Sequence, residues 1–210
     1  MRSPNSSWPR HWKLADLSPA NGRTLTLVKH SLPIVDPDLP PSRWELSHEG
    51  RRRCTTLADR ISQFDPVAIH ASVEPKATET AKIVAQRLDV PLSVREGLEE
   101  HHRDDVPFFR DPSDFDDAIA RLFEAPDDLV YGAETANQAL TRFERALLTI
   151  IDSQPNSNTV VVSHGTVIAL YLARHCGIDP LGVWRSLGLP SYAVLALPGP
   201  ELLDIVTDIT

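Results

Sequence analysis

Short apolar runs alternate along the chain with longer stretches in which apolar residues recur every three or four positions. The short runs predict strands at residues 25–28, 67–72, 92–94 and 159–162, and a final hairpin at 192–197 and 202–206. The periodic stretches predict helices at residues 47–63, 76–88, 111–124, 134–152 and 167–176. Because strands and helices alternate, the pattern predicts an α/β fold, a three-layer sandwich with a mostly parallel sheet flanked by helices.

The first 23 residues lack both periodicities and mix two tryptophans with basic residues and prolines. They are interpreted as an N-terminal extension, either disordered or packed on the domain through Trp8 and Trp12. Residues 24–210 are expected to form one domain, because 210 residues suit one compact unit with its own core.

Composition excludes several classes of function. A formal net charge of −8 disfavours binding to nucleic acids and to anionic membranes, which both require a positive face. The two cysteines, Cys54 and Cys176, form no cluster with zinc-ligand spacing, so no metal is expected. Since the chain has no apolar run of about 20 residues, it is expected to be a soluble cytoplasmic protein with reduced thiols.

Two histidines stand directly after predicted strands. His30 follows the strand at 25–28, and His164 follows the strand at 159–162. In open α/β sheets, ligands bind beyond the carboxyl ends of the strands, so the fold can bring both rings to one site. Lys76 opens the helix after the second strand, where free backbone N–H groups favour an anion. The sequence therefore predicts a local anion site in an acidic protein.

Four segments resemble signatures of one family. Leu27-Val28-Lys29-His30-Ser31 is similar to the L-V-R-H-G signature of the histidine phosphatase superfamily, the phosphoglycerate mutase-like proteins. Residues 71–81 resemble that family's S-S-P-x-x-R-A-x-Q-T-A, residues 98–100 resemble L-x-E, and residues 160–165 match V-V-S-H-G. Residues 132–135 are a looser match to its G-E-S element. The resemblance runs in unbroken order over residues 24–206 and implies the family's fold.

The resemblance also implies site residues and a reaction. His30 would be the catalytic nucleophile, Glu100 the acid and then the base, and His164 a further catalytic residue. Lys29 and Lys76 would bind the phosphoryl oxygens of the substrate. No cofactor and no metal would take part. The substrate would be a small phosphorylated metabolite or a phosphoprotein, with residues 101–135 as an insertion that covers the pocket.

Two lysines stand where the family usually has arginines, at positions 29 and 76. Lysine keeps the charge but lacks the planar fork that grips two phosphate oxygens. Three functions remain open. The first is a metal-independent phosphatase of the histidine acid type. The second is a phosphoglycerate-mutase-like phosphotransferase, and the third is a catalytically weak protein that binds a phosphorylated ligand.

Other polar residues receive simpler interpretations. His70 falls within a predicted strand and is expected to be structural, and His101 and His102 are expected to be solvated loop residues because adjacent histidines do not share a helix face. The L-x-E register selects Glu100 over Glu99, although either can belong to the acidic surface. Arg43 and Arg103 rank low as further phosphate contacts.

Overall fold

A six-stranded sheet forms the middle layer of the protein. The computed structural model describes residues 22–209, and its strands lie in the order β3-β2-β4-β1-β5-β6. Their bounds are β1 (Arg23–Lys29), β2 (Ala68–Ser72), β3 (Leu92–Arg95), β4 (Thr159–Ser163), β5 (Ser191–Leu197) and β6 (Glu201–Val206). The β1–β4, β2–β4 and β2–β3 pairs are parallel, while the β1–β5 and β5–β6 pairs are antiparallel. The predicted α/β fold with a mostly parallel sheet is confirmed.

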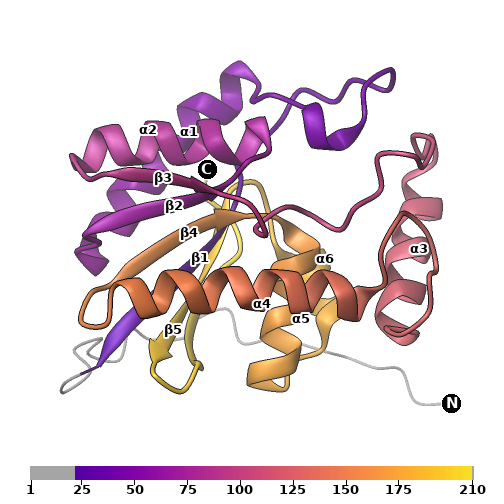
Figure 1. The fold of residues 1–210 in the computed structure, drawn as a ribbon. Helices are drawn as coiled ribbons and strands as arrows, with labels where there is room; N and C mark the ends of the chain where they lie inside the picture. Colours follow the sequence, from indigo (N-terminus) through magenta and orange to yellow (C-terminus); the bar gives the residue numbers. More distant parts are fainter. Residues whose placement is uncertain (1–21, 210) are drawn as a thin grey trace, which may run out of the picture.

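Helices cover both faces of this sheet (Figure 1). The pair α1 (His48–Ile61) and α2 (Pro75–Leu88) lies on one face, and α4 (Ala136–Ser153) and α5 (Gly165–Cys176) lie on the other. Two further helices are α3 (Pro112–Glu124) and α6 (Pro180–Ser186). The pattern of apolar residues did not predict α6, because seven residues make about two turns and show little periodicity.

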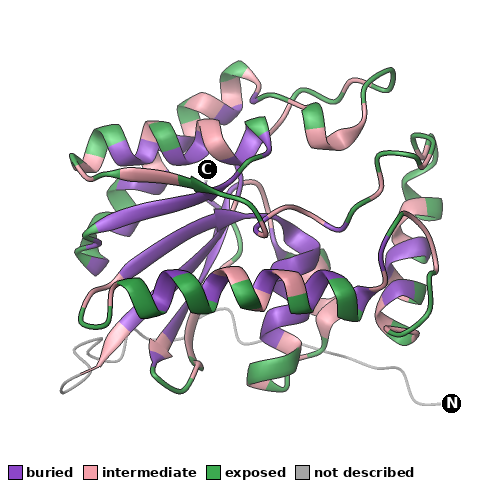
Figure 2. Cartoon of the chain, viewed as in Figure 1, coloured by how far each residue is buried: buried purple, intermediate pink, exposed green. Residues whose placement is uncertain are grey.

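The alternation of side chains along each strand divides the core into two halves. In β4, Val160 and Val162 pack with the α1–α2 half, whereas Val161 packs with the α4–α5 half. All five residues of β4 are buried, and so is the middle of the sheet (Figure 2). A strand that is covered on both faces needs apolar residues at every position, which explains the continuous run of valines.

Local sequence signals set the helix starts beside the strand ends. Ser47 caps α1 by accepting a hydrogen bond from the Gly50 N–H at 2.9 Å, and Thr135 caps α4 in a reciprocal pair with Gln138. Gly50 allows a close approach, because a Cβ there would lie 2.1 Å from the carbonyl oxygen of Leu32. The first turn of α1 thus packs against the loop that follows His30.

Residues 1–21 of the predicted N-terminal extension lie outside the described residues, and Arg23, its last residue, is already the first residue of β1. Among residues 22–209, no helix has both the length and the apolar character needed to cross a membrane.

Candidate active site

Parallel pairing of β1 and β4 brings the two strand-end histidines together. Lys29 at the end of β1 is in register with Ser163 at the end of β4, so the next residues, His30 and His164, emerge at the same edge of the sheet. Their ring centroids are 5.2 Å apart. His164 is also the N-cap residue of α5. The sheet therefore places both rings at the edge where α/β proteins bind ligands.

His30 is buried, and within residues 22–209 its ring makes one hydrogen bond, through Nδ1. Its Nδ1 lies 2.8 Å from the carbonyl oxygen of Ser31, and because a carbonyl only accepts, Nδ1 carries the proton. Burial, followed by the neighbouring His164 and Lys76, holds the pKa of His30 well below its ordinary value. The ring is neutral, and its Nε2 keeps the lone pair that a nucleophile requires.

His164 is fully buried beside two polar side chains from the β2–α2 connection. Its Nε2 lies 2.9 Å from the Ser72 hydroxyl and 3.4 Å from Oε1 of Glu74. Burial lowers the pKa of His164 well below its ordinary value, and the nearby charge of Lys76 lowers it further. Both pKa shifts favour the neutral form of these two imidazoles, which lie side by side.

The two lysines reach this place from different elements and have different partners. Lys29 donates to the carbonyl oxygen of Leu187 at 2.7 Å, and its burial lowers the pKa to about 8, although Glu100 opposes this shift. Lys76, in the first turn of α2, is buried and donates to the Pro41 carbonyl at 2.6 Å and to the carboxylate of Glu74. Both ammonium groups are thus held by protein oxygens.

Glu100 lies at the N-terminus of α5. Its carboxylate accepts hydrogen bonds from the backbone N–H groups of His101 at 2.9 Å, Thr166 at 3.1 Å and Val167 at 3.3 Å. Burial alone would raise the pKa of the Glu100 carboxyl, but the nearby His164 and the N–H groups of Thr166 and His101 outweigh burial and lower the pKa. This shift favours the carboxylate form of Glu100.

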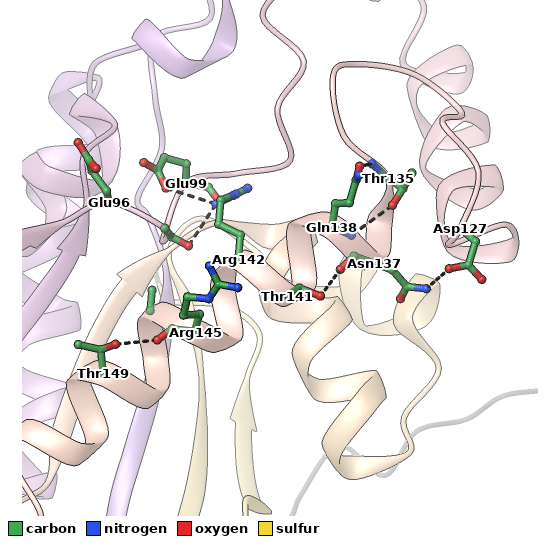
Figure 3. A pocket seen from close by; sticks show the side chains of 12 residues that line it. Glu96, Glu99, Asp127, Thr135, Asn137, Gln138, Thr141, Arg142, Arg145 and Thr149 are labelled. Carbon is green, nitrogen blue, oxygen red and sulfur yellow. Dashed lines mark hydrogen bonds and ion pairs between the residues drawn. The ribbon is translucent and has the colours of Figure 1, made fainter.

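Glu99 turns the other way, toward α4. Its carboxylate lies 3.3 Å from Arg142, as Figure 3 shows, and Arg142 also pairs with Glu134 at 2.6 Å. Arg142 donates in addition to the carbonyl oxygens of Gly97, Glu99 and Glu100. These contacts hold the loop that carries Glu100 in place. Glu99, Glu134 and Arg142 do not line the cavity described next.

A cavity of about 350 Å³ lies between these side chains. Five predicted site residues line it, namely Lys29, His30, Lys76, Glu100 and His164. Aromatic and basic side chains that also line it are Trp44, Arg103, Phe115 and Trp184. A separate open groove runs along the exposed side of α4 between Glu96 and Thr149 and contains none of the five residues (Figure 3). The structure thus brings together every residue predicted for the site.

Sequence reasoning missed three residues that shape the site. Glu74 and Ser72 contact His164, and Arg142 fixes the backbone of the Glu100 loop. Glu74 lies within the segment that resembles a family motif, two residues before Lys76, but at a position that the motif leaves open. Its buried carboxylate is visible only after folding, because no sequence spacing pairs residue 74 with residues 100 and 164.

The other polar residues have mixed outcomes. The prediction that His101 is solvated is wrong, since its ring is buried, lies 2.7 Å from the Glu134 carbonyl and packs against Tyr131. His102 is exposed, as expected, and His70 lies buried in β2 away from the cavity. Arg103 lines the cavity, and its Cζ lies over Phe115, 4.4 Å from the ring centroid.

Arg43 is exposed and does not line the cavity. Both cysteines are free thiols. Among the residues that the structure describes, no group of three His, Cys, Asp or Glu side chains is placed to hold a metal ion.

A sequence model described as "Histidine phosphatase superfamily (branch 1)" matches residues 40–197. The chain belongs to this superfamily. The match spans three quarters of the chain and includes Lys76, Glu100 and His164, but it begins after Lys29 and His30. In this member of the superfamily, the structure supplies what the sequence match leaves out, because β1 places His30 beside His164.

Solved structures share the fold. A mycobacterial glucosyl-3-phosphoglycerate phosphatase is 19% identical with a TM-score of 0.71, covering 89% of this chain and 99% of its own. YhfR of Bacillus stearothermophilus is 21% identical with a TM-score of 0.72, covering 90% and 98%. A phosphoserine phosphatase mutant from Entamoeba histolytica in complex with phosphoserine is 17% identical with a TM-score of 0.68, covering 88% and 97%. Comparison with curated protein sequences gave no match. These likenesses establish the phosphoglycerate mutase-like fold of this superfamily member.

Proposed function

We propose that the protein hydrolyses phosphate monoesters through a phosphohistidine on His30, without a metal or cofactor, and that Glu100 is the acid and base. One observation carries this proposal. The Nδ1–H of His30 donates to the Ser31 carbonyl, so the lone pair of the ring is on Nε2. His30 lines a cavity that two lysines also line. Membership of the histidine phosphatase superfamily supports it.

The proposed reaction has two steps. Nε2 of His30 attacks phosphorus and forms an N–P bond while the bond from phosphorus to the leaving oxygen breaks, and Glu100 gives that oxygen a proton. In the second step, Glu100 takes a proton from water, the water oxygen bonds to phosphorus, and the N–P bond breaks. Lys29, Lys76 and His164 stabilise the charge on the phosphoryl oxygens in both steps.

The acid role requires that Glu100 gain a proton when substrate binds. His164 and the backbone N–H groups of Thr166 and His101 favour its ionised form. A phosphate dianion beside it raises the pKa of a carboxyl group by repulsion between like charges. We therefore propose that Glu100 takes up its proton together with the substrate.

The size of the cavity favours a small substrate. About 350 Å³ is near the lower end of the range for small-molecule sites. Solved relatives include proteins named as phosphatases for glucosyl-3-phosphoglycerate and phosphoserine. We propose a small phosphorylated metabolite rather than a phosphoprotein. Residues 101–105 and Phe115 lie at the cavity, so we also assign substrate selection to the pocket-covering segment 101–135.

The same chemistry suits a cytoplasmic enzyme, because small phosphorylated metabolites and reduced thiols are both found there. The net charge of −8 supports the absence of nucleic-acid and membrane partners.

A catalytically weak binding protein is the second candidate. The pairing of Lys76 with Glu74 favours it, because a carboxylate inside an anion pocket competes with the phosphate for the same ammonium group. Such a protein would bind inorganic phosphate and show no turnover.

Rapid quenching distinguishes the two functions. The purified protein is mixed with ³²P-labelled esters in EDTA, quenched within milliseconds, and tested for acid-labile, base-stable label. We expect label on His30, and its complete loss in His30→Ala with the fold retained by circular dichroism. Turnover with label on another residue would contradict the mechanism. Phosphate binding without turnover of any ester would favour the binding protein.

A further inference from the structure

We propose that Glu74 is a positioning residue that holds the ammonium group of Lys76 for the phosphoryl transfer. This inference rests on the proposed function, because it assigns the geometry of the same cavity. Glu74 is the N-cap residue of α2, yet its side chain accepts no capping hydrogen bond and turns instead into the cavity. It is buried, with only 6% of its surface exposed.

A buried carboxylate in an anion pocket needs a physical reason. Removing a carboxylate from water costs several kcal/mol unless hydrogen bonds and opposite charge compensate. Glu74 has such partners on both oxygens. Oε2 accepts from Lys76, and Oε1 accepts from the Glu100 N–H at 2.8 Å and lies 3.4 Å from Nε2 of His164. One side chain thus contacts three of the predicted site residues.

The contacts of Lys76 show what this arrangement does. Lysine presents a point charge with three rotatable N–H donors on a flexible stem, whereas arginine presents a rigid fork. Two donors of Lys76 are directed to fixed oxygens, the Glu74 carboxylate and the Pro41 carbonyl. The remaining N–H therefore has a defined direction. Glu74 and Pro41 together supply the orientation that a guanidinium group would have by itself.

The link to Glu100 extends the same argument. The Glu74 carboxylate receives the backbone N–H of the residue assigned as acid and base, so the phosphate-binding ammonium and the acid are fixed to one group. A shift of Glu74 would move both. The position of Glu74 therefore affects the transition state more than the initial binding of an anion.

Glu74→Gln tests this inference, because glutamine keeps the size and an acceptor for the Glu100 N–H but removes the charge. We expect kcat for p-nitrophenyl phosphate to fall about 10-fold to 100-fold, the value of one charge-assisted contact. The Ki of inorganic phosphate should stay the same or become lower, because a negative charge has left the pocket. Loss of the position of Lys76 thus lowers kcat, whereas loss of the repulsion between Glu74 and phosphate leaves Ki unchanged or lowers it.

Glu79→Gln is the matched control. Glu79 lies on the same helix and bridges Arg51 at 2.5 Å and the backbone N–H of Leu46 at 3.0 Å, outside the cavity. It should lower stability to a similar extent without a change in kcat or Ki. An unchanged kcat in Glu74→Gln, or a parallel weakening of kcat and phosphate binding, would overturn the inference, since the first indicates a bystander and the second a loosened fold.

A second measurement does not depend on turnover. The chain has four lysines, and an ammonium group held by hydrogen bonds exchanges its protons slowly enough to give a ¹⁵N NMR signal. The signal of Lys76, assigned by its loss in Lys76→Met, should persist in Glu79→Gln and vanish in Glu74→Gln. A signal that persists in both variants would overturn the assignment to Glu74. Absence of turnover in the unmodified protein would instead count against the proposed function alone.

Discussion

Glu99 and Glu100 are neighbours in the chain but belong to two regions with different electrostatics. Glu99 joins the cluster around Arg142, where one guanidinium group pairs with the carboxylates of Glu99 and Glu134. Glu100 joins the cavity, where backbone N–H groups are its hydrogen-bond donors and His164 lies nearby. The ion pairs of Glu99 hold the loop in place, whereas the carboxylate of Glu100 faces the cavity in which the proposed proton transfer takes place.

The two lysines repeat this contrast inside the cavity. Lys76 is matched by the carboxylate of Glu74, whereas Lys29 has only the carbonyl oxygen of Leu187 as its near partner. Burial without a direct ion pair is the reason that the pKa of Lys29 falls to about 8. The same residue type therefore has a carboxylate partner at one position and only a carbonyl hydrogen-bond partner at the other.

Replacement of the two glutamates gives the largest expected effect. Glu100→Gln should slow alkyl phosphates about 100-fold to 10,000-fold, because a poor leaving group needs a proton at departure. The loss should be much smaller with p-nitrophenyl phosphate, which has a good leaving group. Glu99→Gln should change neither rate by more than a few-fold. Steady-state kcat on both esters measures this, and the opposite ranking would assign the acid to Glu99.

Removal of the Lys76 charge comes next. Lys76→Ala should lower kcat/KM about 30-fold to 1,000-fold, by analogy with the loss of one oxyanion contact, or roughly 2 to 4 kcal/mol. Lys82→Ala, on the same helix but outside the cavity, is the control and should leave kcat/KM unchanged. Equal rates in both variants would show that Lys76 does not contact the phosphoryl group.

The Lys29 ammonium predicts a pH dependence. Its pKa of about 8 means that the group loses its positive charge as pH rises through that value. The pH profile of kcat/KM reports the free enzyme, so kcat/KM should fall about tenfold per pH unit on the alkaline side. Lys29→Met should have low activity without this alkaline decrease. A wild-type profile that stays flat to pH 10 would contradict the role of Lys29.

Substitution by arginine gives the smallest expected effect and separates an adapted pocket from a degraded one. Lys29→Arg and Lys76→Arg should leave turnover unchanged or lower it several-fold, because the longer guanidinium must fit where protein oxygens already hold the ammonium groups. A Cβ built on Gly165 would lie 3.2 Å from Cε of Lys29, so room is limited. If Lys29→Arg combined with Lys76→Arg raised a negligible activity by orders of magnitude, the catalytically weak binding protein would become the better interpretation.

Much of the site could be predicted because short motifs sit at strand ends. The valine run before His164 identifies a buried strand, and a parallel sheet has only one edge where its strands end. The role of His101 could not be predicted in this way. Its burial depends on Glu134 and Tyr131, which lie about 30 residues further along the chain, and no local period connects loops over that distance.

The sequence by itself determined the α/β class and most of the strands and helices, though not α6, because hydrophobic period is a local property. Together with the family resemblance, its short motifs singled out five residues that line the cavity. Only the tertiary structure decided which partners each charged side chain has. Glu74 meets Lys76, Glu100 and His164 because the β2–α2 connection, the loop after β3 and the end of β4 converge at one edge of the sheet. The direction of a pKa shift depends on burial and on neighbours within a few ångströms, and both come into existence when the chain folds.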